Sequence, residues 1–266
     1  MYDYHTHSFF SDDSDTPIQD MIEAAICKGV KEMAITDHYD PGYPNPDFPF
    51  LIDFDKYLET LLYVERKYAN QIKIIKGIEL GIQNGETMDL IKKAANALPY
   101  DFIIGSVHAI DHIDLYKSYF GGDRPAHEGL KRCYEYVYEC LTEFKDFDVL
   151  GHINIIDRYV PNQEIPSYAP YMDHIEAILK LLIENGKGIE FNASCFRYLK
   201  NGRTTPSREI LTLYKDLGGE ILTYGSDAHV TKDIVDHYDF VMDLFRNIGF
   251  KYLTTFEKRK PTFIKL

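Results

Sequence analysis

Two histidines near the start of the chain, His5 and His7, stand two positions apart in the YDYHTH segment at residues 2–7. Side chains of an extended strand alternate between its two faces, so both imidazoles would point the same way. Two imidazoles on one face make half of a metal site. Two surface histidines in a frayed terminus would show the same spacing, so the interpretation depends on whether other ligands arrive from elsewhere in the chain.

Further residues of metal-ligating type each stand just beyond a segment with the pattern of a β-strand. In parallel α/β folds, the C-terminal ends of the strands form the edge at which active sites are assembled. Any one of these residues alone could be structural, but six of the ten histidines would fall at this edge. The set therefore predicts a metal centre. Its members after the opening pair are His38, Glu79, His108, His152, Asp227 and His229.

The ligand types narrow the choice of metal. Imidazole nitrogens with carboxylate oxygens suit zinc, iron or manganese, and the absence of cysteine from the set argues against a closed structural zinc site. Asp227 and His229 repeat the two-residue spacing, and Glu79 could bridge two metals. Of the adjacent pair Asp37 and His38, we expect His38 to be the ligand and Asp37 to support it. The number of ligands predicts two or three ions.

The elements that would position these residues alternate between strand and helix along the whole chain. This alternation predicts an α/β protein with parallel strands, either closed into a barrel or left as an open sheet. No shift in composition suggests a linker, so residues 1–266 are expected to form a single domain. The expected strands after the opening one are residues 31–36, 72–78, 101–107, 148–151, 188–192 and 220–224.

The expected helices begin with one that Thr16 caps and Pro17 opens, ending at Gly29. The C-terminal tail, which holds Pro261, is expected to be irregular. Two long connections are candidate lids: the proline-rich residues 39–54 and the polar and aromatic residues 109–125. The later helices are expected over residues 55–68, 86–98, 127–144, 170–184, 206–218 and 232–250.

Composition restricts the partners. The 266 residues carry a formal net charge of -13, which disfavours a nucleic-acid backbone or an anionic membrane as the main partner. The polar N-terminus lacks the pattern of a signal peptide, and no apolar run approaches the roughly 20 residues of a membrane span. The four cysteines form no CxxC pair and are expected to be reduced thiols. These features predict a cytoplasmic protein.

The ordered set of motifs resembles the PHP family, named for polymerases and histidinol phosphatases. The resemblance spans residues 2–229, and the EFNAS segment at 190–194, followed by Arg197, further resembles the stand-alone histidinol-phosphate phosphatases of the family. The motifs that carry it are DYHTH at 3–7, SDDS at 11–14, TDH at 36–38, GIE at 77–79, GSVH at 105–108, GH at 151–152 and GSDAH at 225–229.

The resemblance implies a distorted (β/α)7 barrel, similar to a TIM barrel, with the metal site at the C-terminal rim of its strands. Asp12 competes with its neighbour Asp13, where many family members have histidine, and Asp3 would orient an imidazole. Carried over residue by residue, the ligands of three metals are His5, His7, Glu79 and Asp227 for the first, Glu79, His108 and His152 for the second, and Asp13, His38 and His229 for the third.

The implied chemistry is hydrolysis of a phosphate monoester. A hydroxide that bridges two metals would attack phosphorus in line with the departing alcohol, without a phosphorylated side chain. Arg158 and Arg197, in loops at the rim, are expected to bind the phosphate through their planar guanidinium groups. Either Asp227 or a metal-bound water would protonate the leaving group. Glu79, Asp227, Arg158 and Arg197 are thus the expected catalytic residues.

The resemblance favours L-histidinol phosphate as the small-molecule substrate, in histidine biosynthesis. A PHP phosphoesterase acting on phosphotyrosine, nucleotides or sugar phosphates is the nearest alternative, because motif residues determine the chemistry more firmly than the substrate. An amidohydrolase would usually need a bridging lysine at a strand end, and none is offered. A non-catalytic metal-binding module would not need so many ligands. Both a monomer and a homodimer remain open.

Overall fold

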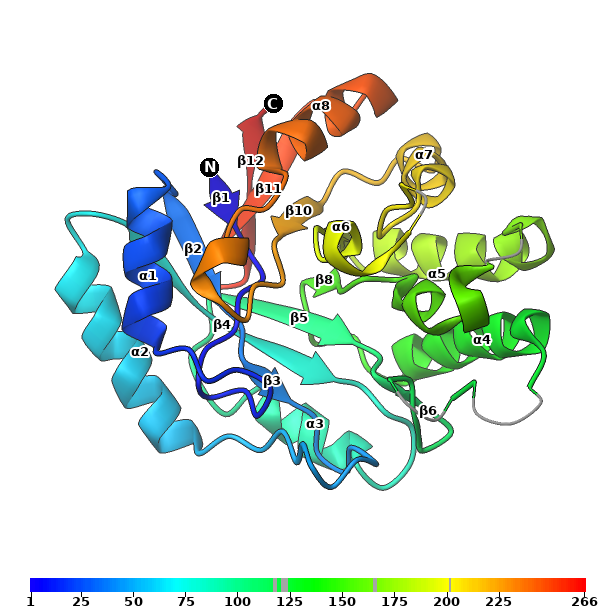
Figure 1. The fold of residues 1–266 in the computed structure, drawn as a ribbon, viewed down its shortest axis with the longest axis horizontal. Helices are drawn as coiled ribbons and strands as arrows, with labels where there is room; N and C mark the ends of the chain where they lie inside the picture. The colour runs from blue at the N-terminus through cyan, green and yellow to red at the C-terminus, as the bar shows by residue number, and fades with distance from the viewer. Residues whose placement is uncertain (117–118, 121–123, 165–166, 201) are drawn as a thin grey trace.

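The computed structural model describes residues 1–116, 119–120, 124–164, 167–200 and 202–266 (Figure 1). Its main feature is an eight-stranded parallel sheet in the order β1-β2-β4-β5-β8-β9-β10, with β3 also paired to β4. The strands are β1 (Tyr2–Asp3), β2 (Glu32–Ile35), β3 (His38–Tyr39), β4 (Lys73–Gly81), β5 (Phe102–Ser106), β8 (Val149–Leu150), β9 (Gly188–Asn192) and β10 (Leu222–Gly225).

The two ends of this sheet meet, so that it forms a nearly closed barrel. The Tyr4 amide donates to the Tyr224 carbonyl at 2.9 Å, and the Asp227 amide donates to the His5 carbonyl at 2.8 Å. β2 and β3 pair with β4 in one continuous register and act as one interrupted strand. The expectation of a distorted (β/α)7 barrel is confirmed.

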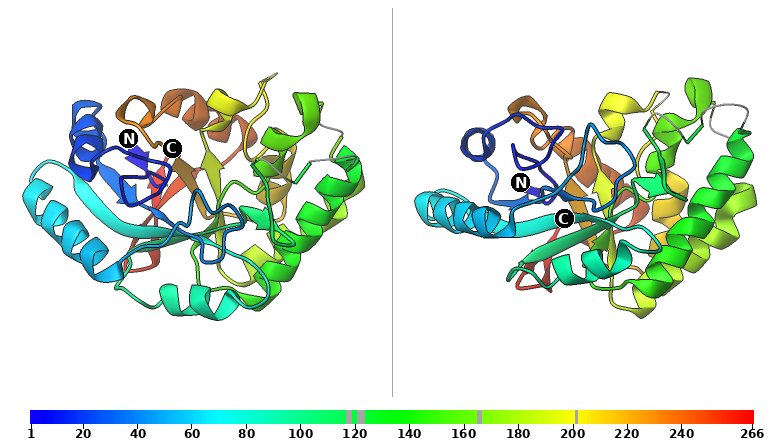
Figure 2. Two further views of the ribbon diagram at one scale, coloured as in Figure 1. Left: turned by 60° about the horizontal axis from the view of Figure 1, so that its bottom comes forward. Right: turned by 90° about the horizontal axis from the view of Figure 1, so that it is seen from below.

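Helices cover the outside of the barrel, as two further views show (Figure 2). The first begins at Ile18, and Thr16 does not cap it: its hydroxyl instead donates to the His229 carbonyl at 2.8 Å. The described helices are α1 (Ile18–Cys27), α2 (Phe54–Tyr68), α3 (Met88–Ala94), α4 (Ala126–Glu143), α5 (Met172–Glu184), α6 (Cys195–Tyr198), α7 (Arg208–Asp216) and α8 (Tyr238–Ile248), with short 3-10 turns at Ile155–Tyr159, Pro161–Gln163, Ala169–Tyr171 and Thr231–Asp233.

The C-terminal tail is an antiparallel hairpin of β11 (Tyr252–Glu257) and β12 (Lys260–Lys265), so the expectation of an irregular tail is wrong. Pro261 lies in β12, whose outer edge pairs with no strand in the part of the chain that the structure describes. Such an edge tolerates a residue that cannot donate a hydrogen bond. Phe256 of β11 packs with Tyr4 and Phe102 in a buried apolar cluster.

The two predicted lids meet beside the barrel. Residues 40–53 have no regular secondary structure, whereas the second connection contains the hairpin of β6 (Ala109–Ile110) and β7 (Ile113–Asp114). Residues 117–118 and 121–123 of that connection lie outside the described residues. The Tyr43 hydroxyl donates to Asp114 Oδ1 at 2.6 Å and joins the two connections. Among the described helices, none is both long and apolar enough to cross a membrane.

Candidate metal centre

Glu79, near the end of β4, lies at the centre of the predicted ligand set and is fully buried. Its Oε2 atom lies 3.0 Å from His5 Nε2 and 3.0 Å from His38 Nδ1. The other oxygen, Oε1, lies 3.0 Å from His152 Nε2 and 3.3 Å from His108 Nε2. His7 Nε2 lies 3.6 Å from Oε2, so one carboxylate faces five imidazoles from four other segments of the chain, as a carboxylate that bridges two metals must.

His108 and His152 form the clearest site together with Glu79. Their Nε2 atoms are 3.2 Å apart, and both approach Glu79 Oε1. Ligands about 2.0–2.1 Å from a tetrahedral zinc ion are separated by roughly 3.4 Å. The three donor atoms thus fit around a single ion.

A second group combines the opening histidine pair with Asp227. Asp227 Oδ1 lies 3.3 Å from His7 Nε2 and 3.9 Å from His5 Nε2. The two residues His5 and His7 do present their rings to the same space, with centroids 5.0 Å apart. Oxygen and nitrogen donors at these separations suit one further ion.

The third predicted group surrounds Asp13. Its Oδ2 atom lies 3.1 Å from His229 Nε2 and 3.7 Å from His38 Nε2. The competing residue Asp12 is engaged elsewhere, since its Oδ2 atom accepts a hydrogen bond from the Phe50 amide at 2.5 Å. The structure therefore directs Asp13 and not Asp12 toward the other ligands.

Unsatisfied ring nitrogens provide an independent test of whether the site fits metals. Buried polar atoms nearly always have a hydrogen-bond partner. Among the described residues, three buried ring nitrogens lie 3.0–3.3 Å from a carboxylate oxygen but lack the geometry of a hydrogen bond: His7 Nε2, His38 Nδ1 and His229 Nε2. Buried imidazole nitrogens gathered around carboxylates are the donor set of a metal centre, so the residues present fit zinc, iron or manganese.

The electrostatics of the cluster favour ionised carboxylates. Burial opposes the charge on Glu79, but His5, His38 and His108 outweigh it and hold the pKa of Glu79 well below its usual value. Burial likewise opposes protonation of His38, yet Glu79 and Asp13 raise its pKa to about 9. Burial and neighbouring imidazoles lower the pKa of His7.

Two carboxylates orient metal-ligand candidates without having been predicted to do so. Glu190 Oε1 lies 2.5 Å from His5 Nδ1, and Asp40 Oδ2 lies 2.6 Å from His108 Nδ1. Each leaves the Nε2 atom of its histidine free to bind metal. The sequence offered only a weak indication of these roles: Glu190 belongs to the EFNAS segment, and Asp40 follows His38 by two residues.

The two supporting aspartates expected from the sequence act less directly. Asp37 accepts from the Ser11 hydroxyl at 2.9 Å, and Ser11 Oγ lies 3.1 Å from His7 Nδ1. Asp3 accepts from the backbone amides of Ser226 and Val235, at 2.8 and 3.0 Å. Asp3 thus anchors the segment that carries Asp227 and makes no described hydrogen bond to an imidazole.

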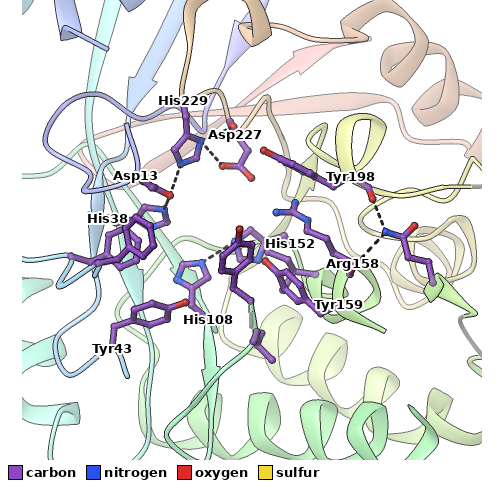
Figure 3. A pocket seen from close by; sticks show the side chains of 16 residues that line it. Asp13, His38, Tyr43, His108, His152, Arg158, Tyr159, Tyr198, Asp227 and His229 are labelled. Carbon is purple, nitrogen blue, oxygen red and sulfur yellow. Dashed lines mark hydrogen bonds and ion pairs between the residues drawn. The ribbon is translucent and has the colours of Figure 1, made fainter. Parts of the chain in front are cut away.

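The cluster opens into a cavity of about 560 Å³ (Figure 3). Arg158 projects into it, with its guanidinium 4.3 Å from the Tyr198 ring centroid. Tyr119 does not line the cavity: it is buried elsewhere, and its hydroxyl donates to the Gly129 carbonyl. The lining residues beyond the metal-ligand candidates are Tyr43, Phe48, Phe50, Leu115, Tyr116, Ile155, Arg158, Tyr159, Gln163 and Tyr198.

Arg197 does not line this cavity. Its Nη2 atom donates to the carbonyls of Ser226 and Asp227, at 2.9 and 2.8 Å. Its Nε atom lies 3.5 Å from Asp233 Oδ2. The structure therefore brings Arg158 to the cluster but directs Arg197 toward the backbone behind Asp227.

Comparison with known proteins finds relatives that match nearly the whole chain. The chain is 29% identical over 262 residues to the histidinol-phosphatase of Lactococcus lactis, covering 97% of this chain and 95% of that protein. It is 30% identical over 261 residues to a probable histidinol-phosphatase of Clostridium acetobutylicum, covering 97% and 98%.

Solved structures and a family model agree with these relatives. The crystal structure of the Lactococcus lactis histidinol phosphate phosphatase, complexed with zinc, L-histidinol and phosphate, matches with a TM-score of 0.88 and 26% identity over 98% of both chains. A putative histidinol phosphatase from Listeria monocytogenes shares the fold, with a TM-score of 0.78 at 19% identity, over 90% of this chain and 99% of that one. The PHP domain model matches residues 3–194, so the chain belongs to the PHP domain family.

Proposed function

We propose that this protein is a metal-dependent phosphatase that hydrolyses L-histidinol phosphate to L-histidinol and phosphate. One observation carries the proposal: a Glu79-centred cluster of imidazoles and carboxylates opens into a cavity that also holds the Arg158 guanidinium. The relative bound to zinc, L-histidinol and phosphate supports the choice of substrate, since it matches over 98% of this chain.

We infer two or three bound ions, of zinc, iron or manganese, at the three groups of ligands. Glu79 would be shared between the first two groups, and Asp13, His38 and His229 would hold the third ion. Close metal ions neutralise phosphoryl oxygens and lower the pKa of water enough for attack at neutral pH. All 266 residues are proposed to form one domain, because β10 completes the barrel beyond the segment matched by the family model.

The roles of the chain's own residues follow from where they lie. Arg158 would bind the phosphate in the cavity, since its guanidinium donates along two parallel directions. Asp227 would accept a proton from the attacking water and return one to the leaving oxygen. Burial opposes ionisation of Asp227, but its contacts with His7 and the charge of His5 hold its pKa well below the usual value, so the carboxylate is ionised.

The remaining cavity wall supports a flat, apolar or aromatic leaving group. Tyr43, Phe48, Phe50, Tyr159 and Tyr198 line it, and aromatic side chains pack well against a planar ring such as imidazole. Phosphotyrosine, nucleotides and sugar phosphates are the alternative phosphomonoesters, because the cluster determines the reaction more than the substrate.

The test is to purify the protein, count its metals and measure phosphate release from a panel of phosphomonoesters. We expect histidinol phosphate to have a kcat/KM at least about tenfold above that of p-nitrophenyl phosphate, equivalent to roughly 1.4 kcal/mol of transition-state binding. Equal turnover of the two would contradict the substrate assignment but leave the phosphatase assignment intact. Absence of phosphate release from the zinc-loaded protein would contradict both.

A further inference from the structure

Three polar side chains in and just beyond β9 lie between the metal-ligand candidates and Arg158. Glu190, Asn192 and Ser194 occupy alternate positions and are almost completely buried, with exposed fractions of 1%, 0% and 0%. Buried polar groups are costly unless each is hydrogen-bonded. Each of these three side chains is therefore expected to have hydrogen-bond partners.

At one end, Glu190 holds two of the metal-ligand candidates. Its Oε1 atom accepts from His5 Nδ1 at 2.5 Å, and its Oε2 atom accepts from the His152 backbone amide at 3.0 Å. The same Oε2 atom accepts from Asn192 Nδ2 at 3.2 Å. Glu190 thus connects a residue of the first metal group and a residue of the second to Asn192.

At the other end, Ser194 holds the guanidinium that faces the cavity. Arg158 Nη2 donates to Ser194 Oγ at 2.6 Å. The Ser194 hydroxyl donates in turn to Asn192 Oδ1, and the Ser194 backbone amide donates to the same oxygen at 3.1 Å. Asn192 therefore joins the two ends with both atoms of its amide group.

Each hydrogen bond in this series runs in one direction only. A guanidinium can donate but not accept, so Ser194 Oγ must accept from Arg158 and direct its own hydrogen to Asn192. Two donors then face Asn192 Oδ1, which requires its Nδ2 atom to face Glu190. Polarised hydrogen bonds of this kind strengthen one another and rigidify the groups they join.

We propose that Glu190, Asn192 and Ser194, here called the β9 hydrogen-bond chain, are positioning residues that hold Arg158 in a constant place relative to His5 and His152. The proposal rests on the proposed function, because it assigns Arg158 to the phosphate. A phosphate ester must reach the metals and the guanidinium together. Such groups need to be held within about 0.5 Å of their productive places, and Arg158 stands on a short 3-10 turn.

The first experiment is a double-mutant cycle on the zinc-loaded protein with Ser194→Ala and Arg158→Ala. Inorganic phosphate is the probe, and its affinity is measured by calorimetry, so the readout does not depend on the substrate. Thr204→Val is the matched control, since the Thr204 hydroxyl is also buried but donates to the Pro206 carbonyl, outside the chain of contacts.

We expect Ser194→Ala to weaken phosphate binding roughly tenfold, the weight of one hydrogen bond to a charged group, and to raise KM more than it lowers kcat. In the Arg158→Ala background, the same change should have almost no further effect. Thr204→Val should bind phosphate as the parent does. Additive losses, or unchanged phosphate affinity in Ser194→Ala, would overturn the proposal even if histidinol phosphate proves to be the substrate.

The second experiment tests Asn192 as the link between the two ends. Asn192→Asp keeps the shape but places a carboxylate beside Glu190 where an amide donor stood. We expect it to lower both the zinc content, measured by elemental analysis, and the phosphate affinity, whereas Ser194→Ala should retain the parent's zinc content. An Asn192→Asp protein that keeps zinc and phosphate affinity would contradict the proposal. Circular dichroism identifies an unfolded variant, and the Ser194 cycle then decides alone.

Discussion

At the scale of single residues, the candidate site depends on a buried carboxylate whose charge is matched from several directions. Glu79 is fully buried, and no arginine or lysine is among its described partners. Burying an unpaired carboxylate would cost several kcal/mol or more. Five imidazoles surround the carboxylate and offset part of that cost, and the metal ions that we propose would offset more.

Asp227 is a second residue whose position needs support. Its φ angle of +53° lies in the left-handed region, which costs a non-glycine residue of order 1–3 kcal/mol. Its carbonyl accepts from Arg197 Nη2 at 2.8 Å and lies 3.1 Å from His229 Nδ1. Arg197 therefore stabilises the conformation that carries the Asp227 carboxylate to the cluster.

The two arginines should consequently behave differently when replaced. We expect Arg158→Ala to raise KM or lower kcat/KM by about tenfold or more while retaining the parent's metals. Arg197→Ala should lose part of the bound metal, because the backbone of Asp227 would no longer be held. Elemental analysis and steady-state kinetics on both variants check this. Full metal content with a raised KM in Arg197→Ala would instead support the phosphate contact expected from the sequence.

At the scale of elements, the C-terminal hairpin covers one end of the barrel and is bonded to it by a charged residue. Arg259, between β11 and β12, donates to Asp148 Oδ2 at 2.5 Å and to Asp146 Oδ1 at 3.2 Å. Its backbone amide donates to the Asp101 carbonyl at 2.9 Å. Asp148 also accepts from the Ile103 amide, so the hairpin is tied to the segment before β8 and to β5.

Replacing Arg259 should therefore reduce stability rather than activity. We expect Arg259→Met to lower the free energy of unfolding by about 1–3 kcal/mol, because the largely buried Asp148 loses its charged partner. Arg246→Met is the matched control. Arg246 pairs with exposed Asp243, so its loss should cost less than about 1 kcal/mol. Urea unfolding compares them, and equal losses would show that the hairpin is not held by this pair.

At the scale of the whole molecule, the candidate site gathers residues from 5 to 229, and so requires the complete barrel. Glu79 stands on β4 and His38 on β3, while His108, His152 and Asp227 follow β5, β8 and β10. Metal ions that bind only this assembled arrangement stabilise the folded chain over the unfolded one. The site and the barrel are therefore thermodynamically coupled.

Removing the metals should lower the melting temperature of the protein. At metal concentrations about a thousandfold above Kd, binding contributes roughly 4 kcal/mol, which corresponds to a shift on the order of 10 °C for a chain of this size. Differential scanning calorimetry with and without EDTA measures it, and added zinc should restore the parent value. Glu79→Gln, which removes the carboxylate shared by the first two groups, should show a smaller shift with EDTA than the parent. A parent protein insensitive to EDTA would contradict the coupling.

The sequence by itself determined the fold class and the residues now found around Glu79. In a parallel α/β fold, residues just beyond the strands converge whatever the details of packing, so His108 and His152 could be placed together from the sequence alone. The strand and helix alternation predicted parallel strands, in a barrel or an open sheet, and the resemblance of the motifs to the PHP family implied the distorted (β/α)7 barrel. These predictions depend on the periodicity of apolar residues and on the order of the motifs, and both can be read directly from the sequence.

Only the tertiary structure decided where side chains outside the strand ends point. Arg197 contacts the backbone behind Asp227, Glu190 and Asp40 orient histidines, and the tail forms a hairpin across the barrel end. These contacts join residues far apart in the sequence, through loop dihedral angles that no local pattern encodes. Their direction depends on how the connections pack after the barrel has closed, and that is a property of the folded molecule.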